Sequence, residues 1–260
     1  MTEALLALPA HVRRRLAAAL ESGMLPAPVS TAALRAVLGV QDETERVHHA
    51  LRELERLGIA GAAGAAWIRT IEEVRAREVR PDLVWSGPEV PGVYARDTRR
   101  VFEELIGAAN RSIWISTYAF FDGPRAFESL AARMDSVDGL RVTLLLNVQR
   151  RRGDSTSSPD LVRRFADRFW QTEWPGTARP RVFYDPRSLE PDGPAGVLHA
   201  KAVVTDDAAV FVTSANLTEA AFDRNVELGL LVRDTALALS VTAQLQALID
   251  RELLRPLPSD

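Results

Sequence analysis

Residues 198–216 read LHAKAVVTDDAAVFVTSAN, and this stretch decides the fold class of the larger part of the chain. Two apolar, β-branched runs, residues 197–205 and 210–214, flank a polar pair, and this pattern predicts two strands joined by a tight turn. Because side chains alternate between the two faces of a strand, His199 and Lys201 are predicted to share one face. An imidazole then lies beside an ammonium group.

The second strand brings an amide and a hydroxyl to the same place. Ser214 and Asn216 share a face if the strand pattern continues to the end of the segment. If the two strands pair as a hairpin, these groups converge with His199 and Lys201 on one pocket. A histidine can attack the phosphorus of a phosphodiester, while the other groups neutralise and hydrogen-bond the oxygens on which charge develops.

The elements around this segment predict a layered α/β domain over residues 96–260. Strands alternate with helices, which is typical of such folds. The predicted strands are 112–120, 140–147, 181–184, 197–205, 210–214 and 226–232, and the predicted helices are 97–109, 124–137, 159–170 and 235–254. Prolines and glycines in residues 79–95 predict a linker or a loop that leads into this domain.

Residues 1–78 are predicted to form a small, mostly helical module. Apolar residues recur at helical spacing in 4–20, 31–38 and 44–57, whereas 59–71 has apolar runs around two glycines that suit a short hairpin. Three helices and a hairpin are typical of winged-helix modules, which can bind DNA through the third helix. That helix carries about as many acidic as basic residues, which favours packing or partner docking over a surface that faces phosphates.

Composition narrows the class of protein. The 260 residues are 47% hydrophobic, include no cysteine and carry a net charge of −3, so disulfides and thiolate metal sites are excluded and a wholly basic surface is not expected. The first residues lack the order of a signal peptide, and no apolar stretch approaches the roughly 20 residues of a membrane span. We therefore expect a cytoplasmic protein with no membrane partner. Among 32 basic residues the single lysine is Lys201, which lies in the segment quoted above.

The spacing His199-x-Lys201-x4-Asp206, followed by Ser214-x-Asn216, resembles the signature of the phospholipase D superfamily. The resemblance implies a layered α-β-α domain with a mixed central sheet. It implies that His199 becomes a covalent phosphohistidine, with no metal and no cofactor. It also implies that Lys201, Asn216 and Ser214 bind the phosphate of the substrate.

The resemblance to the superfamily also concerns three further positions. Glu227, in the segment 225–229, is implied to hydrogen-bond and orient a histidine, as a carboxylate does in other catalytic triads. Asp206 is counted among the catalytic candidates by its place in the motif, although the aspartate at this place usually has a structural role. The superfamily usually has glycine before the serine, and this chain has Thr213 there, which can alter the turn.

A second histidine protonates the leaving group in this superfamily, and the chain carries one copy of the motif. His11, His48 and His49 lie in the predicted N-terminal helices without a lysine two places on, and they are interpreted as helix-surface residues. Superfamily members with one copy pair two subunits across a two-fold axis, which an isologous interface permits. The resemblance therefore implies a homodimer in which each subunit places His199 in one shared active site.

The superfamily acts on lipids or nucleic acids, and several features favour a nucleic acid, DNA rather than RNA. Arg150 and Arg151 lie in a basic run, residues 149–152, after a predicted strand, where they either track phosphates or form a solvated loop. The aromatic residues of 169–174 can stack on bases, although core packing is the favoured interpretation.

Over nearly its full length the chain is similar to the DrmC family, the phospholipase-D-like component of the DISARM anti-phage defence system, most strongly in residues 196–232. This similarity implies a metal-independent nuclease with other defence-system proteins as partners. A scaffold component that binds a phosphate or a nucleic acid without turnover is the alternative, and a phospholipase is the third interpretation.

Overall fold

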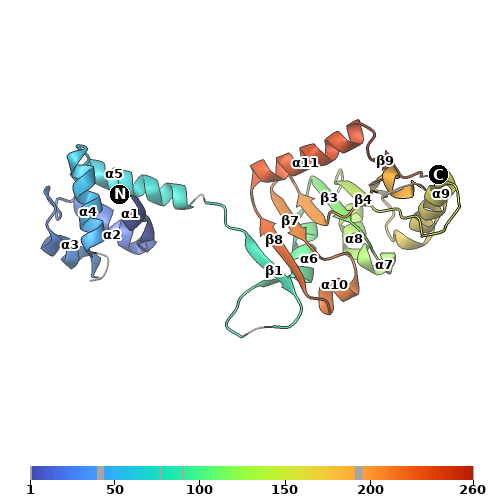
Figure 1. The fold of residues 1–260 in the computed structure, drawn as a ribbon, viewed down its shortest axis with the longest axis horizontal. Coiled ribbons are helices and arrows are strands. Elements are labelled where there is room, and N and C mark those ends of the chain that lie inside the picture. The colour runs from blue at the N-terminus through green and yellow to red at the C-terminus, as the bar shows by residue number, and fades with distance from the viewer. Residues whose placement is uncertain (1, 40–43, 77, 90, 191–195, 260) are drawn as a thin grey trace. The chain divides into compact units, whose positions relative to one another are not determined.

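The computed structural model describes residues 2–39, 44–76, 78–89, 91–190 and 196–259 (Figure 1). Contacts within the chain divide it into two compact units, residues 1–78 and residues 79–260. Each unit buries its own cluster of hydrophobic side chains, as independently packed parts of a chain do.

The regular elements in the described residues of unit 1 are helices: α1 (Thr2–Ala7), α2 (Ala10–Glu21), α3 (Thr31–Leu38), α4 (Thr44–Arg56) and α5 (Gly61–Ala76). The segment 4–20, predicted as one helix, is divided at Pro9, which cannot donate a backbone hydrogen bond. α3 begins after Ser30, whose hydroxyl accepts the N–H of Ala33, and ends at Gly39 in the left-handed conformation. The mostly helical character predicted for this unit is confirmed.

The hairpin predicted for residues 59–71 is wrong, because most of this segment lies in α5. Residues 61–67 read GAAGAAW, and the alanines, which are the strongest helix formers, outweigh two glycines that cost about 1 kcal/mol each. Ile68 and Ile71 lie on the buried face of the helix. Packing against the rest of unit 1 therefore stabilises a helix where local glycines indicated a turn.

Unit 2 is organised around a mixed sheet, in which the described residues form nine strands. Their order is β2 (Arg96–Asp97), β1 (Asp82–Ser86), β8 (Glu227–Val232), β7 (Ala209–Thr213), β6 (Ala202–Thr205), β3 (Ser112–Thr117), β4 (Arg141–Leu146), β5 (Arg181–Tyr184) and β9 (Arg255–Pro256). β3, β4 and β5 are parallel, and β6, β7, β8 and β1 pair antiparallel to one another. The predicted α/β class with a mixed sheet is confirmed.

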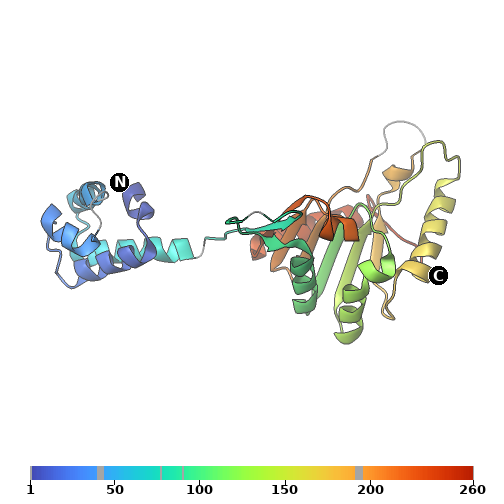
Figure 2. The same cartoon turned by 90° about the horizontal axis from the view of Figure 1, so that it is seen from below.

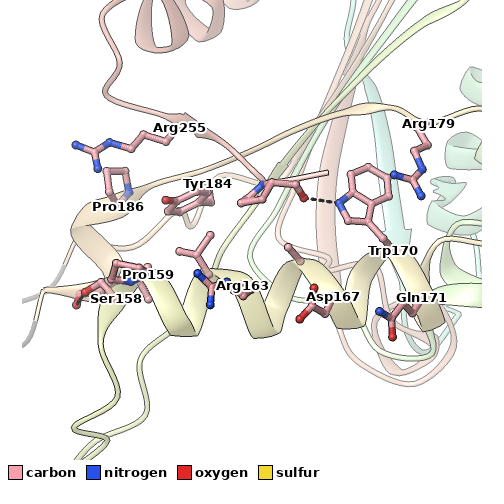
Figure 3. Close-up of a pocket in the computed structure, with 14 residues that line it drawn as sticks. Ser158, Pro159, Arg163, Asp167, Trp170, Gln171, Arg179, Tyr184, Pro186 and Arg255 are labelled. Atoms are coloured by element: carbon pink, nitrogen blue, oxygen red, sulfur yellow. Dashed lines mark hydrogen bonds between the residues drawn. The ribbon is translucent and has the colours of Figure 1, made fainter. Parts of the chain in front are cut away.

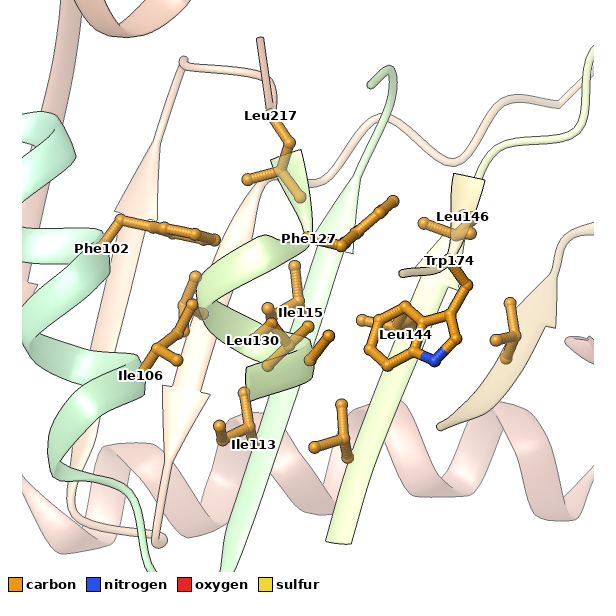
Figure 4. Close-up of a cluster of buried hydrophobic side chains, with 14 of the residues drawn as sticks. Phe102, Ile106, Ile113, Ile115, Phe127, Leu130, Leu144, Leu146, Trp174 and Leu217 are labelled. Carbon is orange, nitrogen blue, oxygen red and sulfur yellow. The ribbon is translucent and has the colours of Figure 1, made fainter. Parts of the chain in front are cut away.

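Helices pack on both faces of the sheet, as Figures 1 and 2 show. One face carries α6 (Thr98–Ala108), α7 (Gly123–Ala126), α8 (Glu128–Ser136), α9 (Ser158–Arg168) and the π-helical turn Phe169–Glu173, and its core includes Phe127 and Trp174 (Figure 4). On the other face α11 (Thr235–Asp250) buries Ala238 against Trp114 and Val210. The short helix α10 (Glu219–Asp223) lies between β7 and β8 in sequence. Because both faces are packed here, every residue of β3 is buried.

Residues 82–86, predicted to lie in a linker or loop, form β1 and pair with β8. Leu83 and Val212 are both cross-strand partners of Leu230, so the three side chains share one face, and Leu228 lies two residues along the same strand. Their exposed fractions are 40% for Leu83, 53% for Val212, 53% for Leu228 and 46% for Leu230. We call these four residues the open sheet face.

Candidate active site

His199 and Lys201 lie at the sheet edge where the parallel strands end. β6 begins at Ala202, so both residues precede the strand, whereas a strand was predicted from residue 197. The N–H of Thr213 donates to the Lys201 carbonyl at 3.1 Å, which extends the pairing with β7 by one residue. The backbone thus holds Lys201 in register with the neighbouring strand although it lies outside β6.

The Lys201 amine lies against the imidazole of His199. Its Nζ is 3.2 Å from Nδ1 and 3.3 Å from Nε2 of the ring, and it donates to the His199 carbonyl at 2.8 Å. Tyr118, which follows β3, packs its ring at 4.8 Å from the imidazole and 5.6 Å from Nζ. The two motif residues share one side of the chain, as the strand pattern predicted, and Tyr118 is a neighbour that the sequence did not indicate.

Burial changes the acidity of this amine. Lys201 is 9% exposed, and loss of hydration lowers its pKa below the ordinary value, while the carboxylate of Glu227 acts in the opposite direction. His199 is exposed. The geometry therefore combines an accessible imidazole with a poorly hydrated cation, for which an incoming phosphate would supply a counter-charge.

The turn after β7 is held by side-chain contacts. Asn216 Oδ1 accepts the N–H of Ala119 at 3.3 Å, which ties this turn to the end of β3. Thr213 Oγ1 accepts the N–H of Ala215 at 3.0 Å. Thr213, at the place where the superfamily usually has glycine, lies in β7 and its hydroxyl supports the turn.

Glu227 lies at the start of β8, beside this turn. Its carboxylate accepts a hydrogen bond from the Ser214 hydroxyl and another from the Asn225 amide at 3.2 Å. Ser214 Oγ in turn accepts the N–H of Leu228 at 3.1 Å. Glu227 thus positions Ser214, and the bond to a histidine that the resemblance implies stays a prediction.

These side chains surround one hollow of about 710 Å³ at the sheet edge. Its lining is His199, Ala200, Lys201, Ala202, Val212, Thr213, Ser214 and Asn216. The structure therefore brings together the four side chains that the two strand segments were predicted to place in one pocket. Val212 belongs both to this lining and to the open sheet face, so the hollow borders that face.

The family described as "Cardiolipin synthase, PLD-like domain" matches residues 102–249, more than half of the 260-residue chain and all of the residues around the hollow. The chain belongs to the phospholipase D superfamily. No curated protein matches this phospholipase-D-like chain.

Several solved structures resemble it at low sequence identity. The phospholipase D family member Nuc from Salmonella typhimurium is 21% identical, with a TM-score of 0.45 over 70% of this chain and 100% of Nuc. NucT from Helicobacter pylori is 22% identical, with a TM-score of 0.43 over 66% of this chain and 97% of NucT. Phosphatidylserine synthase from Haemophilus influenzae Rd KW20 is 18% identical, with a TM-score of 0.46 over 76% of this chain and 47% of the synthase.

The motif aspartate of this phospholipase-D-like domain lies at the far end of β6. Five residues of extended chain separate Asp206 from Lys201, which is roughly 16 Å. The Asp206 carboxylate accepts the N–H groups of Ser112 (2.9 Å), Asn110 (2.9 Å) and Arg111 (2.7 Å). Burial by itself raises the pKa of Asp206, and these backbone donors outweigh it and lower the pKa. Asp206, counted among the catalytic candidates, instead fixes the start of β3 to the end of β6.

The two arginines predicted to contact substrate differ in their surroundings. Arg150 donates to the carbonyls of Leu189 (3.0 Å), Asp154 (2.9 Å) and Thr156 (2.5 Å) and to the Ser158 hydroxyl (2.9 Å). Its guanidinium is therefore occupied in shaping the loop before α9, and its assignment to substrate binding is corrected. The Arg151 side chain is exposed.

The aromatic residues of 169–174 are mainly core residues in this phospholipase-D-like domain. Phe169 and Trp174 are buried and pack with Phe127, which confirms the favoured interpretation. Trp170 is half-buried and lines a second hollow. In the part of the chain that the structure describes, no helix combines the length and apolarity needed to cross a bilayer.

Proposed function

We propose that this chain is a phosphodiesterase that acts through a phosphohistidine intermediate on His199. The single observation that carries the proposal is the position of Lys201 Nζ within 3.3 Å of both ring nitrogens of His199, on the border of an open hollow. A cation at this position draws an anionic phosphate to the imidazole and offsets the charge that develops on its oxygens. Asn216 and Ser214 supply further hydrogen-bonding groups for those oxygens.

The reaction has two steps. First, a ring nitrogen of His199 attacks phosphorus with its lone pair, the N–P bond forms as the bond to the leaving oxygen breaks, and that oxygen takes a proton from His199 of the partner subunit. Second, water attacks phosphorus, the same partner imidazole takes its proton, and the N–P bond breaks. An alcohol and a phosphate monoester leave, and both imidazoles return to their first state. These steps use no metal ion and no cofactor.

A homodimer with a shared site is part of this proposal. Within the described residues, the lining of the hollow contains one imidazole, and the two steps need two. The open sheet face, Leu83, Val212, Leu228 and Leu230, is a contiguous apolar surface of the kind that marks protein interfaces. A second copy that covers this face across a two-fold axis approaches the hollow, because Val212 belongs to both.

The proposed substrate is a nucleic acid, DNA rather than RNA, and the proposed setting is cytoplasmic anti-phage defence of the DISARM type. The similarity to the DrmC family supports this setting, and the exposed Arg151 supports a polyanionic substrate. We propose that residues 1–78 form a separate module that docks other defence proteins, and that the catalytic domain begins with the segment that contains β1.

The test compares the whole chain with His199→Ala in the presence of EDTA, on DNA, RNA and phosphatidylcholine vesicles. We expect DNA to be cleaved fastest and the phosphatidylcholine of the vesicles to release no choline. We expect the variant to lose at least about a thousand-fold in kcat. His49→Ala is the matched control, because His49 is exposed on α4 and should leave activity unchanged.

A second readout follows the covalent intermediate. Denaturing the enzyme during turnover of a ³²P-labelled substrate should trap acid-labile, alkali-stable label on the parent chain and not on His199→Ala. Cleavage that survives His199→Ala would remove this residue from the mechanism. DNA binding with neither turnover nor trapped label would replace the enzyme with the scaffold interpretation.

A further inference from the structure

A second hollow lies beside α9, on residues that take no part in the site around His199 (Figure 3). Its volume is about 620 Å³, within the roughly 300–1,000 Å³ of ligand pockets. α9 and the π-helical turn supply Arg163, Asp167 and Trp170 to one wall, and residues 255–258 with β5 supply the facing wall. The hollow is thus built from segments that lie far apart in the sequence.

Positive charge dominates its lining. Arg163, Arg179 and Arg255 supply three guanidinium groups against the single carboxylate of Asp167. Arg163 pairs with Asp160 at 3.8 Å while its side chain is 71% exposed, and an exposed pair of this kind is weak enough for an incoming anion to replace. The hollow therefore favours an anionic ligand.

One end of the hollow has a fixed aromatic surface. Trp170 Nε1 donates to the Pro258 carbonyl at 2.7 Å, and its ring packs edge-on against Phe169 at 4.9 Å. The guanidinium of Arg179 lies 5.0 Å from the centre of the Trp170 ring. A half-buried indole that is already held in place, with a cation over it, can contact a flat ring at little cost in side-chain entropy.

We propose that this hollow binds a nucleotide, with its phosphate between Arg163 and Arg255 and its base against Trp170 and Arg179. Cations combined with an aromatic platform are the means by which proteins hold single nucleic-acid strands. Asp167 is placed to accept a hydrogen bond from an amino or hydroxyl group, which a nucleotide carries and inorganic phosphate in its ionised form offers poorly. The nucleotide is either free or one unit of a strand, and for a strand the inference rests on the proposed function.

The test measures binding in the His199→Ala background, so that turnover cannot intervene. The probe is fluorescein-labelled hexathymidylate, with thymidine monophosphate and inorganic phosphate as competitors. Arg163→Gln combined with Arg255→Gln should weaken binding of the probe at least ten-fold. It should also flatten the slope of log K against log salt by about 0.7, since the two arginines share one phosphate and each lost phosphate contact on a single strand contributes about 0.7.

The controls separate a specific loss from a loss of charge or of folding. Arg100→Gln combined with Arg141→Gln removes two exposed guanidinium groups of unit 2 outside this lining, and should leave binding unchanged. Trp170→Leu should weaken binding about 5- to 150-fold, as expected for a lost stacking contact. Trp170→Phe keeps a ring and should retain most of the binding, which shows that the loss in Trp170→Leu is not a folding defect.

Unchanged binding in the arginine or tryptophan variants would overturn the proposal. So would displacement of the probe by inorganic phosphate at the concentration at which thymidine monophosphate displaces it, because no base would then be recognised. Equal affinity for thymidine monophosphate and hexathymidylate identifies a free nucleotide as the ligand, and tighter binding of the hexamer identifies a strand; both support the proposal.

Hydrolysis of bis(4-nitrophenyl) phosphate, measured with His199 intact, separates this inference from the proposed function. This substrate is too small to need the second hollow, so the cavity variants should hydrolyse it at the rate of the parent. Absence of hydrolysis in the parent, with the expected binding results, would reject the phosphodiesterase and leave the nucleotide site in place.

Discussion

Replacing Asp206 by asparagine should destabilise unit 2 while leaving the hollow around His199 intact. The carboxylate accepts three backbone N–H groups, and an amide offers one oxygen, so at least one donor loses its partner. Hydrogen bonds to a charged group contribute about 1.5–3 kcal/mol and neutral ones about 0.5–1.5 kcal/mol. Because the contacts to Asn110 and Arg111 are exposed to solvent, we expect a net loss of about 1–2 kcal/mol in the free energy of unfolding.

For a unit of this size the loss corresponds to a fall in Tm of about 2–8 °C, measured by circular dichroism at neutral pH. Asparagine tolerates the left-handed backbone of residue 206, whose φ is 52°, so strain should not add to the effect. Asp207→Asn is the matched control, because Asp207 has the same φ and its carboxylate accepts one hydrogen bond, from Thr242 at 3.2 Å. Its Tm should fall less.

The pH dependence of the difference gives a second check. The pKa of Asp206 is lowered in the folded state, so its contribution is complete above the unfolded value of about 3.9 and is lost as the pH falls through the folded value. The gap in stability between the parent and Asp206→Asn should therefore be full at neutral pH and close in acid. A variant that keeps its Tm but loses activity would refute a structural role for this aspartate.

Three other substitutions follow from the geometry. Glu227→Gln removes the carboxylate that opposes the burial-driven lowering of the Lys201 pKa, so the alkaline limb of the kcat/KM profile should move to lower pH; an unmoved limb would exclude this electrostatic link. Gly229→Ala places a Cβ 2.6 Å from the Phe211 ring and should lower the free energy of unfolding, measured by chemical denaturation, by about 1–3 kcal/mol. An unchanged denaturation midpoint would contradict this. Leu228→Lys should give a folded, inactive monomer in sedimentation, and an active monomer would reject the shared site.

Much of the fold could be predicted from sequence because local pattern and tertiary packing agree. The bounds predicted as 31–38 and 181–184 match α3 and β5. The predictions fail where contacts between residues far apart in the sequence determine the local structure. Residues 61–76 form a helix because their apolar face is buried in unit 1, and residues 82–86 form a strand because β8 offers an unpaired edge.

In the candidate site, too, contacts within one segment could be predicted and contacts between distant segments could not. Strand alternation sufficed to bring Lys201 to His199, since both lie on one short segment. Tyr118 could not be identified, because its contact with the imidazole depends on which strand lies beside β6. Residues at the end of a neighbouring strand, where it reaches the same sheet edge, are the ones to consider as further members of the site. Arg150 could not be told from a solvated arginine, because nothing in a basic run indicates that loop carbonyls will occupy its guanidinium.

Because the single lysine of the chain is buried in this site, chemical modification of its amine can be used to probe the site. Acylating reagents modify neutral amines, and apart from the terminal amine Lys201 is the one available target. Burial that lowers its pKa enlarges the uncharged fraction at a given pH, while 9% exposure restricts access by the reagent. The rate at which the adduct appears on the peptide that carries Lys201, resolved from the N-terminal peptide after digestion, thus reports opening and occupancy of the hollow without any mutation.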